Sequence, residues 1–87
     1  MNKVLILDKA KEFVSRLNSV NRRDALEDIG CKYSVAESFP EFEEEFYFDM
    51  TGYFRGLWAA GVISNEELYG VNNLIYAFKV GYQMPQA

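Results

Sequence analysis

The chain has 87 residues, of which 49% are hydrophobic and 16% aromatic, and it carries a formal net charge of −4. This length supports one domain, and the hydrophobic content is too high for a disordered chain, so we expect a single helical domain over residues 1–87 with disorder confined to residues 84–87. A negative net charge disfavours general binding to DNA, RNA or anionic membranes, because their surfaces attract positive groups.

Two absences narrow the chemistry further. The chain contains no histidine and a single cysteine, Cys31. Catalytic triads, zinc sites and iron–sulfur clusters built by one chain are therefore excluded, and no phosphate-binding glycine loop is present. No run of about 18 apolar residues occurs that would predict a membrane span. We expect no catalytic residue, no metal site and no cofactor, and we interpret Cys31 as a small buried side chain in a cytoplasmic protein.

The first half of the chain predicts two amphipathic helices. Apolar residues recur at helical spacing over residues 6–17, although residues 4–7 taken alone would also suit a short strand. Asn21, with an acidic residue three positions later, resembles the cap of a second helix. Gly30 weakens that helix, so a bend there is an alternative. The face expected to be buried contains Leu26, Ile29, Tyr33 and Ala36.

A third helix is predicted from a capping signal at Ser38. Pro40 is tolerated in a first helical turn, and Glu41 can return a hydrogen bond to the cap. The helix should end just before Gly61, which can adopt the left-handed conformation that terminates helices. A break at Gly52, giving five helices in all, is the alternative.

The fourth helix has the best-defined start. Ser64 and Glu67 form a capping-box pattern, and Ile63 and Leu68 are spaced as a hydrophobic staple around it. The helix should end near Gly81. Its core face is expected to contain Leu68, Val71, Ile75, Phe78 and Tyr82. Four helices with short connections predict an all-α fold, a compact antiparallel bundle of about four helices.

Acidic and aromatic residues alternate along the third helix, and helical geometry separates them. At 100° per residue the rings and other apolar side chains share one arc, which we assign to the core. That arc contains Phe42, Phe46, Tyr47, Met50, Tyr53, Phe54, Leu57 and Trp58. Phe48 lies instead among the carboxylates, which suits packing under the first or second helix or anchoring in a pocket of a partner. The predicted partner-binding residues are Glu41, Glu44, Glu45, Phe48 and Asp49.

A second candidate surface is poor in charge. Gly52 and Gly56 stand four residues apart in the third helix and together cost it about 2 kcal/mol, so the close approach of another helix would be a reasonable compensation. The fourth helix has an uncharged face that suits burial against another subunit. The predicted oligomer interface contains Gly52, Gly56, Tyr69, Asn73 and Tyr76.

These features favour a small, acidic, non-enzymatic protein that binds another protein. The expected partner is a basic, nucleic-acid-handling protein, whose phosphate-binding groove the carboxylates would occupy by charge mimicry. In size, charge and lack of catalytic residues, the chain resembles the small inhibitors encoded by phages and mobile elements, including anti-CRISPR proteins. That resemblance is one of composition and implies an inhibitor without assigning roles to residues.

Two alternatives stay open from the sequence. The first is a homo-oligomeric protein that binds or sequesters a ligand, assembled through the uncharged surface. The second is a helix-turn-helix-like regulatory DNA binder built on the first two helices, although direct nucleic-acid binding is disfavoured because acids are mixed with its bases. Its phosphate contacts would be Arg16, Arg22, Arg23 and Lys32.

Overall fold

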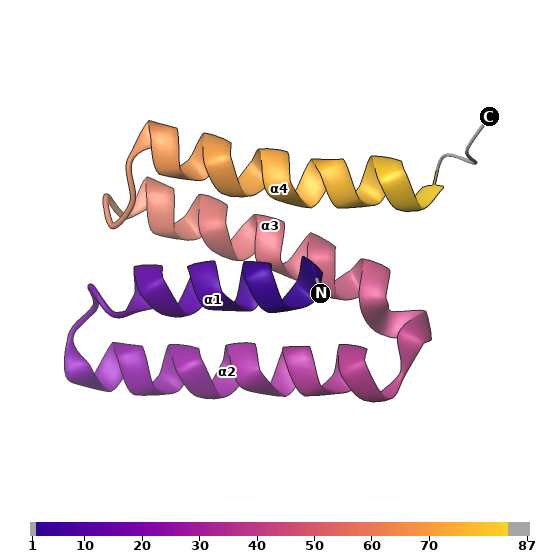
Figure 1. Ribbon diagram of the computed structural model, residues 1–87. Coiled ribbons are helices and arrows are strands. Elements are labelled where there is room, and N and C mark those ends of the chain that lie inside the picture. The colour runs from indigo at the N-terminus through magenta and orange to yellow at the C-terminus, as the bar shows by residue number, and fades with distance from the viewer. Residues whose placement is uncertain (1, 84–87) are drawn as a thin grey trace.

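The protein is a bundle of four α-helices. The computed structural model describes residues 2–83, with side chains described for residues 3–76. The elements are α1 (Asn2–Val14), α2 (Ser19–Ser38), the short 3₁₀ helix η1 (Pro40–Phe42), α3 (Glu43–Ala59) and α4 (Asn65–Gln83). Successive α-helices run in opposite directions (Figure 1). The predicted all-α antiparallel bundle is confirmed, whereas the disorder predicted for residues 84–87 lies outside the described residues.

The bundle is flattened, with extents of 46 × 29 × 17 Å. Each helix packs against its neighbours in the chain, and α1 also contacts α3 and α4. No contact joins α2 to α4 in the described part of the chain. α1 and α3 therefore face each other across the short diagonal of the bundle, and the outward side of α3 forms the ridge of one broad face.

The buried residues of the described chain are all apolar or aromatic. At the centre, the rings of Phe13 and Phe54 meet edge to face with centroids 5.8 Å apart. Tyr33 and Phe46 make a similar contact at 6.0 Å between α2 and α3. Each such pair of rings stabilises the fold by about 0.5–1.5 kcal/mol, beyond the stabilisation that comes from burying their surface. The core contains Ile6, Ala10, Phe13, Val14, Ile29, Ala36, Phe46, Tyr47, Met50, Phe54, Leu57, Ile63, Val71 and Ile75.

The predicted connection between α3 and α4 is confirmed. Gly61 has a φ of 78°, the left-handed conformation that ends α3. The Ser64 hydroxyl accepts a hydrogen bond from the Glu67 amide at 3.1 Å, and the Glu67 carboxylate accepts one from the Ser64 amide at 2.9 Å. Ile63 is buried and Leu68 packs against the core, as the staple pattern requires.

The boundaries of α1 and α2 differ from the predicted ones. α1 begins at Asn2 and ends at Val14, so residues 4–7 are helical and the strand alternative is wrong. The cap of α2 is Asn18, not Asn21. The Asn18 side chain accepts a hydrogen bond from the Asn21 amide at 2.8 Å, which places Asn21 inside the first turn.

The predicted cap at Ser38 is also wrong. Ser38 is the last residue of α2, and the amide of Phe39 donates to the Val35 carbonyl at 2.9 Å. Pro40 starts η1, and α3 begins only at Glu43. Three glutamates, Glu43, Glu44 and Glu45, consequently occupy the first turn of α3, where they stabilise the positive end of the helix dipole. This part of the acidic run therefore also contributes to the stability of α3.

Further expectations about single residues need correction. α2 continues through Gly30 and α3 through Gly52, so neither alternative break occurs. Cys31 is exposed rather than buried.

Two apolar side chains are also more exposed than predicted. Leu26, expected on the buried face of its helix, is 37% exposed. Phe48 is 61% exposed, so it does not pack under α1 or α2. Within the predicted aromatic arc of α3, most residues are buried or half-buried, but the two at its ends are exposed. These are Phe42 and Trp58.

Candidate functional site

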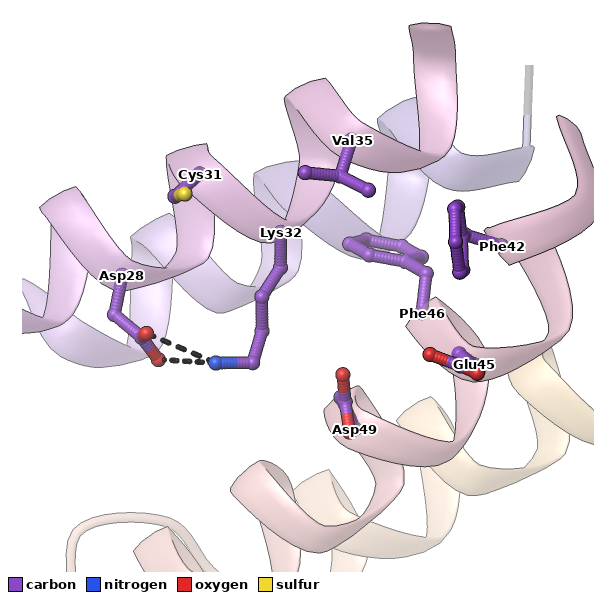
Figure 2. Close-up of a pocket in the computed structure, with 8 residues that line it drawn as sticks. All are labelled: Asp28, Cys31, Lys32, Val35, Phe42, Glu45, Phe46 and Asp49. Atoms are coloured by element: carbon purple, nitrogen blue, oxygen red, sulfur yellow. Dashed lines mark hydrogen bonds and ion pairs between the residues drawn. The ribbon is translucent and has the colours of Figure 1, made fainter. Parts of the chain in front are cut away.

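A groove of about 180 Å³ lies between α2 and the segment formed by η1 and α3 (Figure 2). We call it the α2–α3 groove. Four of its side chains come from α2, one from η1 and three from α3. They are Asp28, Cys31, Lys32, Val35, Phe42, Glu45, Phe46 and Asp49.

The groove has an apolar end and a charged end (Figure 2). At the apolar end, the buried ring of Phe46 lies between Val35 and Phe42, which are 40% and 38% exposed. Exposed apolar groups beside a hollow can cover the hydrocarbon part of a long side chain. The terminal group of such a side chain would then lie at the charged end of the groove.

The charged end contains three carboxylates and one ammonium group. Lys32 donates to both carboxylate oxygens of Asp28 at 2.9 Å. This hydrogen bonding raises the pKa of Lys32, and the charge of Asp49 adds to the effect. Glu45 and Asp49 make no ion pair with any described residue. The groove therefore contains more carboxylates than ammonium groups, and its one ammonium group, that of Lys32, is hydrogen-bonded to Asp28.

Other acids near the start of α3 are used within the fold. Lys3 of α1 forms ion pairs with Glu37 of α2, at 3.3 Å, and with Glu43 of α3. These bonds raise the pKa of Lys3, with the hydrogen bond to Glu43 as the largest cause. Glu37 and Glu43 thus tie three helices together, which separates them from the carboxylates of the groove.

Of the predicted partner-binding residues, some line the groove and others do not. Glu45 and Asp49 line the groove, and Glu41, which precedes the lining residue Phe42 in η1, is exposed but does not line it. Glu44 and Phe48 are exposed on α3 but do not line the groove. The residues on the α2 side of the groove were not among the predicted partner-binding residues. An acid and a base four residues apart at Asp28 and Lys32 were a visible signal, but the sequence does not say which face of α2 meets α3.

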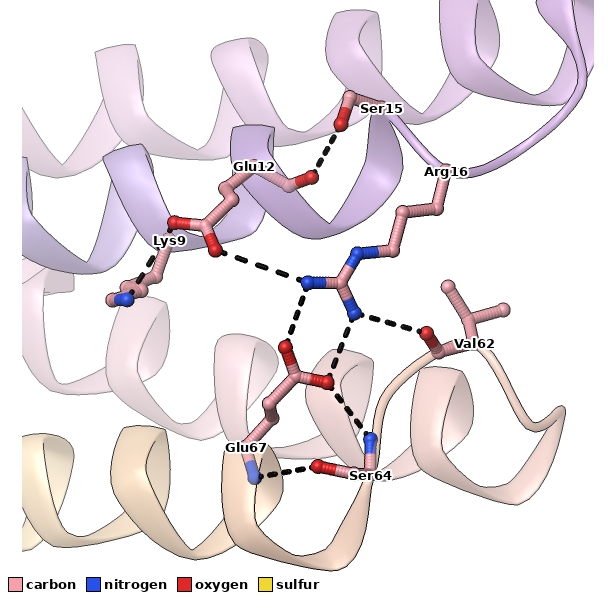
Figure 3. A network of polar contacts seen from close by, with 7 residues as sticks. All are labelled: Lys9, Glu12, Ser15, Arg16, Val62, Ser64 and Glu67. Atoms are coloured by element: carbon pink, nitrogen blue, oxygen red, sulfur yellow. Dashed lines mark hydrogen bonds and ion pairs between the residues drawn. The ribbon is translucent and has the colours of Figure 1, made fainter.

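The candidate phosphate contact Arg16 belongs to a polar network instead (Figure 3). Its guanidinium donates to the two Glu67 oxygens at 2.9 and 2.6 Å and to the Val62 carbonyl at 3.2 Å. It also lies 5.2 Å from the centroid of the Phe13 ring. Arg16 therefore joins the end of α1 to the start of α4. The antiparallel arrangement of α1 and α2 differs from the crossing of about 90–120° between the helices of a helix-turn-helix motif (Figure 1).

This network makes stability depend on pH. The hydrogen bonds from Arg16, followed by the bond from the Ser64 amide, lower the pKa of Glu67 to about 2. Because the carboxylate titrates near its ordinary value in the unfolded chain, its stabilising contribution is complete above about pH 4.5 and is lost as pH falls toward 2. We expect the melting temperature to fall across this window in the wild type. In Glu67→Gln, which cannot titrate, melting curves between pH 5 and pH 2 should show a smaller fall; an equal fall would contradict this role.

The predicted oligomer residues are exposed on α3 and α4, and two of them, Asn73 and Tyr76, line a common hollow. Gly52 and Gly56 are exposed, and a Cβ atom added at either would meet no atom within 4 Å, so no element of the described chain approaches them closely. Tyr69 and Tyr76 are 73% and 68% exposed. A second hollow of about 340 Å³ joins the two helices here. Its lining contains Thr51, Arg55, Asn72, Asn73, Ile75 and Tyr76.

Metal binding and membrane insertion were the other properties considered in the sequence, and they concern the described residues as follows. The described residues contain no group of three or more side chains of the kinds that hold metal ions. Among the described helices, none has both the length and the apolar composition required to cross a bilayer. No known protein family, curated protein or solved structure matches the chain.

Proposed function

We propose that the protein is a non-enzymatic, inhibitor-type binding protein whose α2–α3 groove receives a basic side chain of a nucleic-acid-handling partner. The observation that carries this proposal is the composition of the groove. Three carboxylates from two helices line it, Lys32 donates to one of them, that of Asp28, and the apolar end of the groove adjoins them.

An arginine of the partner matches both ends of the groove. Its methylene chain would lie over Val35 and Phe42, which offer exposed apolar surface. Its planar guanidinium can donate to two carboxylates at once, here Glu45 and Asp49. Lysine has the same charge but cannot form this forked arrangement, so we expect the groove to prefer arginine.

Negative charge outside the groove would also attract a basic partner. Residues 33–87 contain two basic and eight acidic residues, a net charge of −6. Glu41 is exposed on η1, one residue before Phe42 of the groove. Proteins that hold nucleic acids present arginine and lysine to phosphates, so a surface of this kind competes with nucleic acid for them. A mobile-element inhibitor acting by charge mimicry is the form of this function that the chain's composition favours.

Affinity capture tests the function on the intact protein. The immobilised chain is exposed to lysate of a candidate host, and retained proteins are eluted first with rising salt and then, in a parallel experiment, with duplex DNA. We expect a basic nucleic-acid-binding protein that elutes in both experiments, because screening and competition act on the same contacts. Retained proteins that resist both salt and DNA would contradict the proposal.

A further inference from the structure

The hollow between α3 and α4 shares no residue with the α2–α3 groove and differs from it in composition. It is lined by one cation, two carboxamides, two hydroxyl-bearing side chains and one aliphatic side chain, with no carboxylate among them. These residues are Arg55, Asn72, Asn73, Thr51, Tyr76 and Ile75. The volume of about 340 Å³ lies at the lower end of the range of about 300–1,000 Å³ that small-molecule sites occupy. A small molecule therefore fits this hollow, whether or not the α2–α3 groove has the proposed partner.

Arg55 is the cation of the hollow and the one basic residue in the sequence of α3. It is exposed and makes no ion pair with any described residue. A guanidinium can donate two parallel hydrogen bonds to one carboxylate. Asn73, which is exposed in the same hollow, adds a neutral N–H donor from its carboxamide. These two side chains together suit a carboxylate.

Asn72 contributes the opposite kind of group, a hydrogen-bond acceptor that lacks a donor. Its carboxamide oxygen is buried and accepts no hydrogen bond from the described residues. Buried acceptors are nearly always satisfied in folded proteins, so one that belongs to a hollow is explained by a donor that a bound molecule brings. The Thr51 hydroxyl is a second acceptor, because it donates its hydrogen to the Tyr47 carbonyl at 2.9 Å and keeps its lone pairs. An ammonium group, with three N–H donors, can satisfy both oxygens.

The charge around the hollow distinguishes between classes of anion. Residues 33–87 have a net charge of −6, so their field repels a phosphate group with two negative charges. A zwitterion has no net charge, and the same field attracts its ammonium group. An α-amino acid is a zwitterion that holds a carboxylate and an ammonium group on one carbon atom, which are the two groups that the hollow suits.

We infer that the hollow between α3 and α4 binds a free aromatic α-amino acid. Its carboxylate accepts hydrogen bonds from Arg55 and Asn73, and its ammonium group donates to Asn72 and Thr51. Its ring packs against Tyr76, which is 68% exposed and therefore offers an open aromatic surface. The ammonium group separates a free amino acid from the last residue of a peptide, which has a neutral amide in that place and gains less from the negative surroundings.

Analogues of one ligand test the two contacts separately. Titration of the ¹⁵N-labelled whole chain with L-phenylalanine to about 10 mM should shift amide signals at Thr51, Arg55, Asn72 and Asn73, with a dissociation constant below about 1 mM. The analogue 3-phenylpropionate lacks the N–H donors, and phenethylamine lacks the carboxylate, so each should bind more than about tenfold more weakly. N-acetyl-glycyl-L-phenylalanine should also bind more weakly. Absence of shifts in the hollow, equal binding of the two analogues and L-phenylalanine, or tighter binding of the capped peptide would overturn the inference.

Variants of the chain test the same contacts from the protein side. Arg55→Gln should raise the dissociation constant for L-phenylalanine more than about tenfold, whereas Arg23→Gln, at an exposed arginine on α2, should leave it unchanged. Asn72→Leu removes the unsatisfied oxygen, so it should abolish binding without lowering the melting temperature measured by circular dichroism. Wild-type affinity in Arg55→Gln or in Asn72→Leu, equal losses in the two arginine variants, or a lower melting temperature of Asn72→Leu would overturn the inference.

Discussion

Replacing Phe54 by alanine should lower the melting temperature by about 15 °C or more. The Phe54 side chain is fully buried and packs edge to face against Phe13 at the centre of the bundle. Loss of a buried phenylalanine ring costs about 3–5 kcal/mol, which is a large share of the total stability of a domain this small. Thermal unfolding followed by circular dichroism measures the shift.

Phe48→Ala is the matched control, since it removes the same ring from the same helix. Phe48 is 61% exposed, so its loss should change the free energy of unfolding by less than about 1 kcal/mol. The pair of variants therefore separates core from surface within one acidic, aromatic helix. If Phe48→Ala destabilised the protein as much as Phe54→Ala, the assignment of Phe48 to the surface would be wrong.

The elements that the sequence predicted correctly depend on short-range contacts. The capping box at Ser64 and Glu67 joins groups three residues apart, and Gly61 ends α3 through its own backbone conformation. The helical arc of α3 also holds, because a 17-residue helix fixes the relative directions of its side chains. Local patterns of this kind specify their structure without knowledge of the rest of the fold.

The errors arise where two local patterns compete. Ser38 and Pro40 carry the sequence of a helix start, yet α2 continues to Ser38 and buries Ala36 in the core. One further helical turn in α2 is worth more than an early start of α3, because it retains that burial and the bond from Phe39 to Val35. At the other end of α2, two asparagines three residues apart both suit a cap, and the backbone selects Asn18.

Only the α3 residues of the site could be predicted from the sequence, because the α2 residues are brought to it by long-range packing. The sequence places Glu45 and Asp49 on one side of α3, but it does not specify that Asp28 and Lys32 lie across from them. That juxtaposition depends on which faces of α2 and α3 pack together, a long-range property set by Tyr33 and Phe46. The exposed position of Cys31, on the same side of α2, was missed for the same reason.

The second prediction with a large expected effect concerns Glu41→Lys combined with Glu45→Lys. This change removes two attractive charges at the groove and introduces two repulsive ones, so affinity for an arginine-rich ligand should fall more than about tenfold. Both residues are exposed and outside the core, which should leave the fold intact. Asp8→Lys combined with Glu66→Lys is the matched control, because it changes the net charge equally at exposed positions on α1 and α4.

Titration of the ¹⁵N-labelled protein with a nona-arginine peptide, followed by amide NMR shifts, tests the role of the groove most directly. We expect the largest shifts at residues of the α2–α3 groove, above all at Lys32, Glu45 and Asp49, and we expect them to weaken as salt is added. The variant with Glu41 and Glu45 reversed should lose these shifts, and the variant with Asp8 and Glu66 reversed should keep them. Shifts centred on another surface, or equal loss in both variants, would contradict a groove that binds a basic side chain.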